Sequence, residues 1–183
     1  MQQCSDNGGD RELGAYWERQ FCILAAERGF VFSPLQIDKV GSALAYWKEG
    51  ADWKHFTLPD VTIWTCPGQH HEIKHKAPTK MGGVGLEAYR FHALLNFAKV
   101  TGQAVLYTIH NHALSGGRDS QENLIEHWLT ADVIALDSHW DFVSNKGISW
   151  INGEKTEGVV IYYWPVSLWQ PLGSYWVSKR LRI

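Results

Sequence analysis

The sequence predicts a mixed α/β fold built on a central sheet, and three observations support this class. A helical pattern of apolar residues near the N-terminus is followed by short runs rich in β-branched and aromatic residues. Two of these runs flank a Pro-Gly turn, which is typical of an antiparallel strand pair. A second helical pattern and another apolar strand follow, so helices and strands are interleaved over residues 14–110.

The first helix is predicted over residues 14–28. Gly29 is typical of the residue that ends a helix, and short strands are expected over residues 29–35 and 43–47. The residues that recur at the spacing of one helical face are Trp17, Phe21, Leu24 and Ala25.

The next strand pair is predicted around the turn at Pro67-Gly68. Residues 59–64 read Pro-Asp-Val-Thr-Ile-Trp, a composition that favours a strand, and residues 70–75 return as the antiparallel partner. Residues 76–85 form a glycine-rich loop in this interpretation.

A second helix is expected over residues 86–100, closed by Gly102, and a further apolar strand over residues 104–109. The core of the chain therefore ends near residue 110. We expect a single domain over residues 1–183, with the core in residues 11–110 and a β-rich C-terminal elaboration in residues 111–183.

Three features are predicted within the elaboration. Residues 112–123 form a polar loop, residues 133–136 form a short apolar strand, and residues 147–164 form a hairpin around Asn152-Gly153. Several tryptophans also fall in this part of the chain. They either pack the added hairpin against the sheet, stack on unpaired bases, or form a dimer interface.

Composition excludes several classes of protein. The chain has 183 residues, a net charge of −2 and a pI near 6.5, so it does not bind nucleic acid through a global positive field. No apolar run is long enough to cross a bilayer. Cys4, Cys22 and Cys66 contain no Cys-x-x-Cys pair, which favours a reducing compartment. The polar N-terminus does not resemble a signal peptide, and we expect a cytoplasmic protein.

Acidic and basic residues converge on the predicted strand pair. Glu72 and Lys74 are two residues apart and therefore lie on the same side of a strand, whereas Ile73 lies on the other. If the two strands pair, Asp60 and Glu72 reach one metal ion. Their carboxylates, the Ile73 backbone carbonyl and waters are oxygen ligands of the kind that Mg²⁺ prefers, and Mn²⁺ is the expected substitute.

Such a site suits phosphodiester hydrolysis. The metal binds a phosphate oxygen, lowers the pKa of a bound water and stabilises the charge that develops during displacement. The Lys74 ammonium is suited to holding the attacking water and offsetting negative charge on the phosphate. The plain alternative is an Asp turn residue beside an exposed Glu/Lys strand pair.

These residues resemble the PD-(D/E)XK nuclease superfamily. Pro59-Asp60 is followed after eleven residues by Glu72-Ile73-Lys74, and Gly14-Ala15-Tyr16-Trp17-Glu18 is similar to the Gly-x-x-x-Glu on the first helix of many members, including Holliday-junction resolvases. The resemblance implies a restriction endonuclease-like αβββαβ core. It also implies that Glu18 is an additional metal ligand.

Positively charged residues follow the Glu-x-Lys strand. Together with Lys74 they would form a local strip that contacts the phosphates of DNA, although each alone is better explained as a solvated surface charge. The residues predicted to bind DNA are Lys76, Lys80, Arg90 and Arg118.

A group of histidines crowds the same region, and it leaves two interpretations open. A zinc site is one, although neither a helical His-Glu-x-x-His pattern nor paired cysteines support it. Polar lining of the catalytic site is the other. The histidines concerned are His70, His71, His75, His110 and His112.

The first functional hypothesis is a magnesium-dependent DNA endonuclease that acts in restriction, in recombination or repair, or on branched DNA. Cutting both strands of a duplex with one site per chain implies a symmetric homodimer. The alternatives are a non-catalytic nucleic-acid-binding module on the same fold, a nuclease directed at RNA, and a zinc-dependent hydrolase that uses the histidines.

Overall fold

The computed structural model describes residues 7–34, 44–49, 51–64, 68–151 and 154–180. The helices are α1 (Asn7–Glu27), α2 (Ala88–Thr101), α3 (Val133–Leu136) and α4 (Leu172–Arg180). The strands are β1 (Phe32–Pro34), β2 (Leu44–Glu49), β3 (Asp52–Thr57), β4 (Val61–Ile63), β5 (Gln69–Lys76), β6 (Gly83–Glu87), β7 (Ala104–Asn111), β8 (Trp128–Asp132), β9 (Phe142–Ile151), β10 (Glu154–Pro165) and β11 (Gln170–Pro171).

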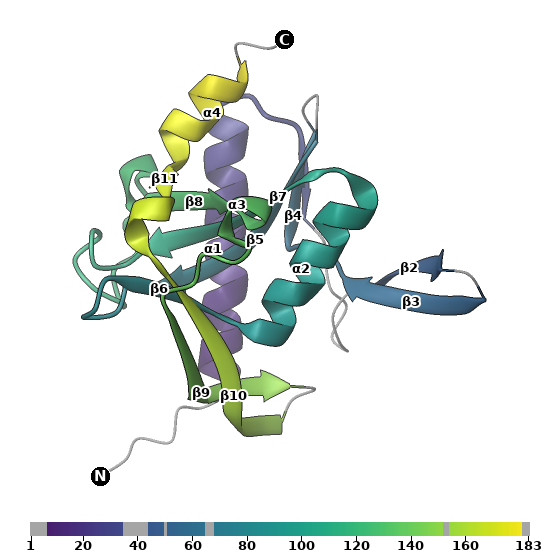
Figure 1. The fold of residues 1–183 in the computed structure, drawn as a ribbon. Coiled ribbons are helices and arrows are strands. Elements are labelled where there is room, and N and C mark those ends of the chain that lie inside the picture. Colours follow the sequence, from purple (N-terminus) through teal and green to yellow (C-terminus); the bar gives the residue numbers. More distant parts are fainter. Residues whose placement is uncertain (1–6, 35–43, 50, 65–67, 152–153, 181–183) are drawn as a thin grey trace.

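A six-stranded mixed sheet forms the centre of the molecule, with the strand order β1-β4-β5-β7-β8-β11 (Figure 1). Only β5 and β7 are parallel, and the other neighbouring strands of this sheet are antiparallel. In chain order α1, β1, β4, β5, α2 and β7 give the expected αβββαβ core. The predicted restriction endonuclease-like fold class is therefore confirmed. The β2–β3 hairpin is inserted between β1 and β4 and projects from the body in Figure 1.

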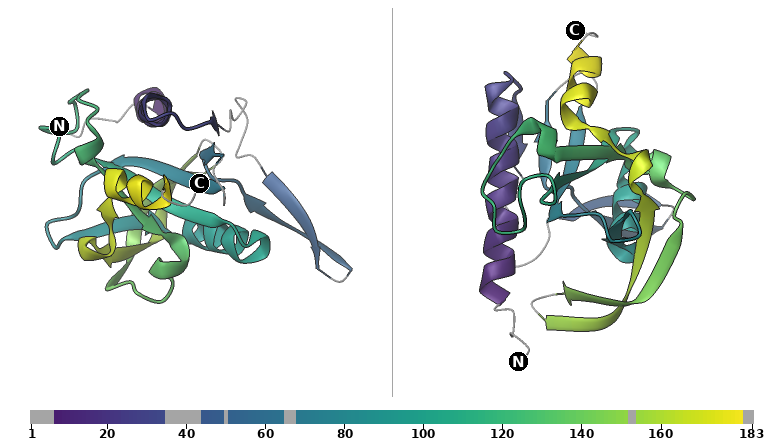
Figure 2. Two further views of the ribbon diagram at one scale, coloured as in Figure 1. Left: turned by 90° about the horizontal axis from the view of Figure 1, so that it is seen from above. Right: turned by 90° about the vertical axis from the view of Figure 1, so that its left-hand side faces the viewer.

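Helices α1 and α2 cover opposite faces of the sheet (Figure 2). On α1, the predicted apolar face is buried, and Trp17 and Phe21 are 1% and 0% exposed. They pack with Ile73 of β5 and Leu106 of β7. On the other face, Phe91 of α2 packs in a cluster that includes alternate residues of β7, namely Val105, Tyr107 and Ile109. The alternation of strand side chains thus divides the core into two layers.

The glycines predicted to end the first and second helices are confirmed at the C-terminal ends of α1 and α2. Gly29 has a φ of 75° and its N–H donates to Ala26 at 2.8 Å, so the chain leaves α1 through the left-handed region that glycine favours. Gly102 ends α2 in the same way, with a φ of 66° and a hydrogen bond from its N–H to the Ala98 carbonyl at 2.9 Å.

The C-terminal part both extends the central sheet and adds a second one. Strands β8 and β11 join the central sheet, whereas β9 and β10 form the predicted hairpin and β10 pairs with β6 in a three-stranded sheet. The predicted turn of this hairpin, Asn152-Gly153, lies outside the described residues. Other residues in the sequence predictions also lie outside them, including Cys4, Leu35, Cys66 and Pro67. The division of the chain into one domain with an elaboration stays a prediction.

Two local predictions were wrong. Residues 133–136 form helix α3 rather than a strand, because the Asp132 carboxylate accepts the Ile134 N–H at 2.8 Å and caps the helix. The glycine-rich loop is also shorter than predicted, because β6 begins at Gly83 and pairs with β10. Among the described helices none is long and apolar enough to cross a membrane.

Candidate active site

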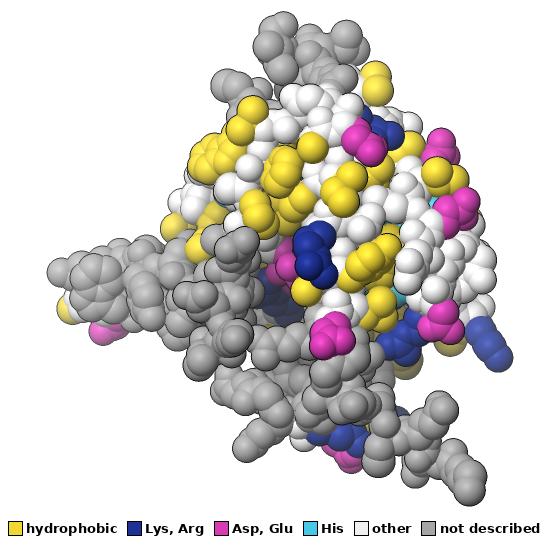
Figure 3. All heavy atoms as spheres, turned by 180° about the vertical axis from the view of Figure 1, so that it is seen from behind, with side chains coloured by type: hydrophobic (Ala, Val, Ile, Leu, Met, Phe, Trp, Pro, Cys, Tyr) yellow, Lys and Arg dark blue, Asp and Glu magenta, His cyan; other side chains and the backbone are white. Residues whose placement is uncertain are grey.

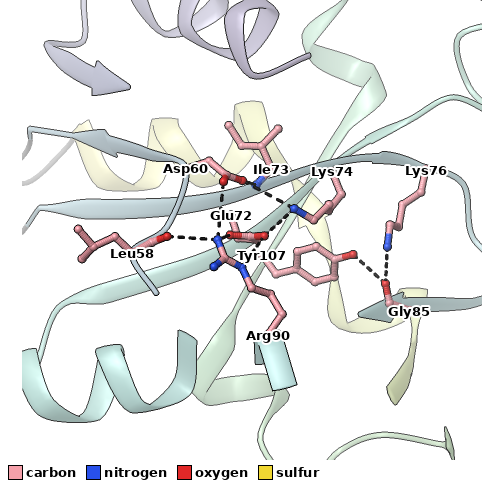
Figure 4. A network of polar contacts seen from close by, with 9 residues as sticks. All are labelled: Leu58, Asp60, Glu72, Ile73, Lys74, Lys76, Gly85, Arg90 and Tyr107. Atoms are coloured by element: carbon pink, nitrogen blue, oxygen red, sulfur yellow. Dashed lines mark hydrogen bonds and ion pairs between the residues drawn. The ribbon is translucent and has the colours of Figure 1, made fainter. Parts of the chain in front are cut away.

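The predicted catalytic residues meet at the middle of β5 (Figure 4). Glu72 and Lys74 lie on the α2 side of the strand, and Lys74 Nζ donates to Glu72 Oε1 at 2.6 Å. Asp60 comes from the bend just before β4, whose antiparallel pairing with β5 brings it to the same place. Its Oδ2 atom accepts the Ile73 N–H at 2.7 Å and lies 3.9 Å from Lys74 Nζ. The sequence therefore predicted correctly that the two carboxylates converge.

Arg90 joins these residues from the first turn of α2. Its Nε donates to Glu72 Oε1 at 2.9 Å, and its Nη2 pairs with Glu72 Oε2, so the guanidinium binds Glu72 with two parallel hydrogen bonds. Nη2 also donates to the Leu58 carbonyl at 3.2 Å and lies 3.7 Å from Asp60 Oδ1. The cluster thus combines two carboxylates with two cations.

Burial makes this charge balance necessary. Glu72 is 0% exposed and Asp60 is 7% exposed. Burial alone would raise the pKa of Glu72, but Lys74 and Arg90 outweigh it and lower the pKa to about 2. Burial raises the pKa of Asp60 to about 6, and the neighbouring charge of Glu72 adds to this effect. Glu72 therefore carries the firmly held negative charge, and Asp60 is the carboxylate that titrates more readily.

Glu18 approaches the cluster from α1, which packs against β5. Burial raises the pKa of Glu18 to about 7, and the negative charge of Asp60 is the next largest cause, followed by a lowering effect of Lys74. The predicted third carboxylate is therefore within electrostatic range of the other two. Glu18 follows the buried Trp17 on α1, and its pKa responds to the charges of Asp60, Lys74, Glu72 and Arg90.

The donor chemistry of this site fits a hard divalent cation. Asp60 and Glu72 offer carboxylate oxygens at one place, Glu18 lies within electrostatic range of both, and oxygen ligands of this kind suit Mg²⁺. In the observed geometry, however, no group of three or more His, Cys, Asp or Glu side chains among the described residues is arranged to hold a metal ion. Arg90 and Lys74 provide the compensating positive charge instead.

The other predicted DNA-binding residues do not form one strip. Lys76 lies on the same side of β5 as Lys74, but its Nζ donates to the Gly85 carbonyl at 2.7 Å. Lys80 is exposed in the turn after β5, and Arg118 is exposed in the loop after β7. On the face shown in Figure 3, Lys and Arg side chains are interspersed with Asp and Glu. Arg90 differs most from the prediction: it was expected in a strip that contacts DNA, but it binds Glu72 and lies near Asp60.

The histidines make contacts of their own. His71 is fully buried and its Nδ1 lies 2.9 Å from Thr108 Oγ1. The Nδ1 atoms of His75 and His110 are 3.0 Å apart, so one ring donates and the other accepts, and both rings stack on Trp17. Both ring nitrogens of His75 and of His110 therefore have partners, since Nε2 of each ring lies near a backbone carbonyl, whereas His71 Nε2 has no hydrogen-bond partner among the described residues.

Sequence reasoning missed the role of Arg90 and the contribution of the Leu58 carbonyl. A signal was available for Arg90: the second predicted helix connects two strands, and a helix between parallel neighbours crosses back over the sheet. An arginine in its first turn therefore lies over the Glu-x-Lys strand. Nothing in the local sequence indicated the contact between Arg90 and Leu58.

No protein-family model and no curated protein sequence matches this chain. Among solved structures, the chain is similar to Hjc, a Holliday junction resolvase from the archaeal hyperthermophile Archaeoglobus fulgidus. The two are 13% identical with a TM-score of 0.47, over 85% of this chain and 90% of that chain.

Removing Arg90 should destabilise the protein strongly in EDTA at neutral pH. Arg90→Met leaves the buried Glu72 carboxylate with Lys74 alone, and breaking a buried ion pair costs about 3–5 kcal/mol. The control is Lys99→Met on the same helix, where an exposed pair with Asp137 at 3.0 Å contributes about 0–1 kcal/mol. Urea unfolding measures both. Equal losses in the two variants would show that Arg90 does not compensate Glu72.

Glu18 should make the protein less stable as pH rises. Because its pKa is raised to about 7 in the folded state, the folded protein binds more protons than the unfolded chain between about pH 4.5 and 7. Glu18→Gln should therefore gain about 1–2 kcal/mol relative to wild type across this window in EDTA, after allowance for solvent screening. Urea unfolding at several pH values checks this, with Glu12→Gln on the exposed side of α1 as the control. A constant difference between Glu18→Gln and wild type would contradict the assignment.

Proposed function

We propose that this protein is a metal-dependent endonuclease that hydrolyses DNA phosphodiester bonds, with Mg²⁺ as the metal and Mn²⁺ as a substitute. The observation that supports this most directly is the convergence of Asp60, Glu72 and Lys74 at the middle of β5, with Glu18 approaching from α1. A nuclease fold and this set of side chains occur together in one chain.

Asp60, Glu72 and Glu18 would hold the metal, together with the Ile73 backbone carbonyl. When bound, the metal supplies positive charge at the phosphate and a water of lowered pKa. The roles of the chain's own residues follow from their positions. The Lys74 side chain is one-third exposed, and its ammonium is bonded to Glu72. It is therefore placed to hold the attacking water and to offset charge on the phosphate.

Arg90 has a dual role in this proposal. Its guanidinium now occupies the position between Asp60 and Glu72 where a divalent cation would compensate the same charges. Binding of the metal therefore requires Arg90 to release at least one carboxylate oxygen. The released guanidinium would lie beside the phosphate, where its planar donors suit two oxygens at once.

A second function is favoured by the same contacts. Unneutralised carboxylates would repel a phosphate, but Arg90 and Lys74 neutralise Asp60 and Glu72 as they stand. A non-catalytic nucleic-acid-binding module is consistent with that balance. The two functions differ in whether a divalent cation displaces Arg90. Action on RNA, and a homodimer that cuts both strands of a duplex, stay predictions.

Cleavage of nucleic acid tests the proposal directly. Supercoiled plasmid, single-stranded DNA, a four-way junction and a matched RNA strand are incubated with the protein in Mg²⁺, Mn²⁺ or EDTA. We expect metal-dependent cutting of DNA that Asp60→Asn and Lys74→Met each reduce at least about a hundredfold, as when one charge-stabilising group is removed. Lys99→Met is the control and should cut as wild type. Undiminished cutting by Asp60→Asn would place the activity elsewhere.

Replacing Arg90 by a neutral residue should strengthen metal binding. Arg90→Gln removes a positive charge that lies 3.7 Å from Asp60 Oδ1, and we expect Mn²⁺ to bind at least about tenfold more tightly. Calorimetric titration with Mn²⁺ measures this without reference to activity. Asp60→Asn is the opposite control and should bind more weakly. The absence of Mn²⁺ binding in both wild type and Arg90→Gln would favour the binding module.

A further inference from the structure

A pocket of about 210 Å³ lies along β5 beyond the carboxylate cluster. Lys76 is its link to the cluster, because it follows Lys74 by two residues on the same side of the strand, roughly 7 Å further along. In Figure 4 Lys76 and Gly85 lie next to the catalytic residues. The lining residues are Lys76, Ala77, Thr79, Gly85, Leu86, Glu87, Ile161 and Tyr163.

The pairing of β6 with β10 determines which residues of the three-stranded sheet face the pocket. Tyr163 lies opposite Gly85 and Ile161 opposite Glu87, so these four residues lie on one face of the three-stranded sheet. The intervening residues, such as Leu86, point into the core on the other face. Because Gly85 has no side chain, the side chains of Tyr163 and Ile161 can lie directly against its backbone on this face.

Tyr163 forms an aromatic wall over the Gly85 backbone. A Cβ atom at Gly85 would lie 2.6 Å from Tyr163 Cε1 and 3.0 Å from the Ile161 side chain, so the glycine is required for the ring to lie this close. The Gly85 carbonyl accepts hydrogen bonds from Lys76 at 2.7 Å and from the Tyr107 hydroxyl at 2.8 Å. The ring and the ammonium are therefore both held in place by the same short strand.

The lining combines one aromatic surface with several polar groups. Tyr163 offers a face for stacking, and Ile161 adds apolar surface. At the edge, the Lys76 ammonium donates hydrogen bonds, the Glu87 carboxylate accepts them, and the Thr79 hydroxyl can do either. A planar ligand with donors and acceptors on its rim suits such a lining. At about 210 Å³ the space is smaller than a typical pocket for a drug-sized molecule, and it suits one ring system.

We infer that this pocket binds one unpaired nucleobase of the nucleic acid whose backbone lies at the catalytic cluster. The inference rests on the proposed function, since it places the base and the reacting phosphate on the same strand. A base within a duplex already uses its pairing edge and is covered by its neighbours, so only an unpaired or extruded base can enter. The chain would therefore select single-stranded or branched substrates.

The observations favour a base over a phosphate group. A phosphate next to Glu87 would be repelled, and the Lys76 ammonium already donates a hydrogen bond to the Gly85 carbonyl. An exocyclic amino group on a base is instead a good partner for a carboxylate. Cytosine should therefore bind more tightly than thymine, with Glu87 as the acceptor.

The test measures binding without cleavage. Fluorescence anisotropy in EDTA follows a fluorescein-labelled single-stranded oligodeoxynucleotide, in which an abasic site is moved through successive positions. We expect one position at which loss of the base weakens binding by wild type about tenfold. Tyr163→Ala should weaken binding of the intact strand to the same extent, and the abasic site should then have no further effect. Changing that base from cytosine to thymine should weaken binding by wild type but not by Glu87→Gln.

Matched variants separate stacking from folding. Tyr163→Phe keeps the aromatic face and should bind as wild type, whereas Tyr163→Leu covers Gly85 without an aromatic ring and should bind like Tyr163→Ala. Trp64→Ala removes an aromatic residue that is 62% exposed and does not line the pocket, and it should bind as wild type. If the abasic site and Tyr163→Leu weaken binding additively, or if Tyr163→Leu binds as wild type, the base pocket is overturned.

Failure of the pocket and failure of the proposed activity give different results. Metal-dependent cutting that does not depend on Tyr163 would leave the nuclease and overturn the pocket. Coupling between Tyr163 and one base without any cutting would keep the pocket and favour the non-catalytic module. If no nucleic acid binds at all, both the pocket and the nuclease are overturned.

Discussion

The buried carboxylate of Glu72 determines how the rest of the site is arranged. A fully buried charge on a central strand is stable only if opposite charges are brought to it, and here Lys74 comes from the same strand and Arg90 from α2. Arg90 reaches Glu72 because α2 connects two parallel strands and crosses back over the sheet. The topology and the charge balance therefore depend on each other, since a different connection would leave Glu72 without the partner that binds both of its oxygens.

Under the proposed function, the same compensation would allow a chain with a net charge of −2 to approach nucleic acid. No global positive field would be needed if the carboxylates nearest the phosphate were already neutralised by Lys74 and Arg90. In that proposal the electrostatic control would be local, because the Arg90 guanidinium and a divalent cation would compete for the same carboxylate oxygens. The nuclease and the binding module would then differ in the position of Arg90.

Contacts between residues that are close in the sequence could be predicted, whereas contacts between distant residues could not. The alternation of Glu72, Ile73 and Lys74 is local, and the proximity of Asp60 needs only the adjacent strand, so both were predicted correctly. Arg90 was assigned to DNA because its true partners lie across a crossover connection. Residues 133–136 were assigned to a strand because four apolar residues have no decisive period, and the capping role of Asp132 was overlooked.

The pocket at Lys76 could not have been predicted in the same way. Gly85 lies in a segment that resembles a loop, and its partner Tyr163 is far along the chain, so only the pairing of β6 with β10 brings them together. Hydrogen bonds also connect the pocket to the strand that carries the carboxylate cluster. The Gly85 carbonyl is bonded to Lys76 of β5 and to Tyr107 of β7, the two parallel strands at the centre of the sheet. A ligand that stacks on Tyr163 therefore contacts β10. This strand pairs with β6, which is hydrogen-bonded to the strand that carries Glu72 and Lys74. In this arrangement the position of a bound base would be set relative to the carboxylates by two hydrogen bonds, which the Lys76 ammonium and the Tyr107 hydroxyl donate to the Gly85 backbone carbonyl.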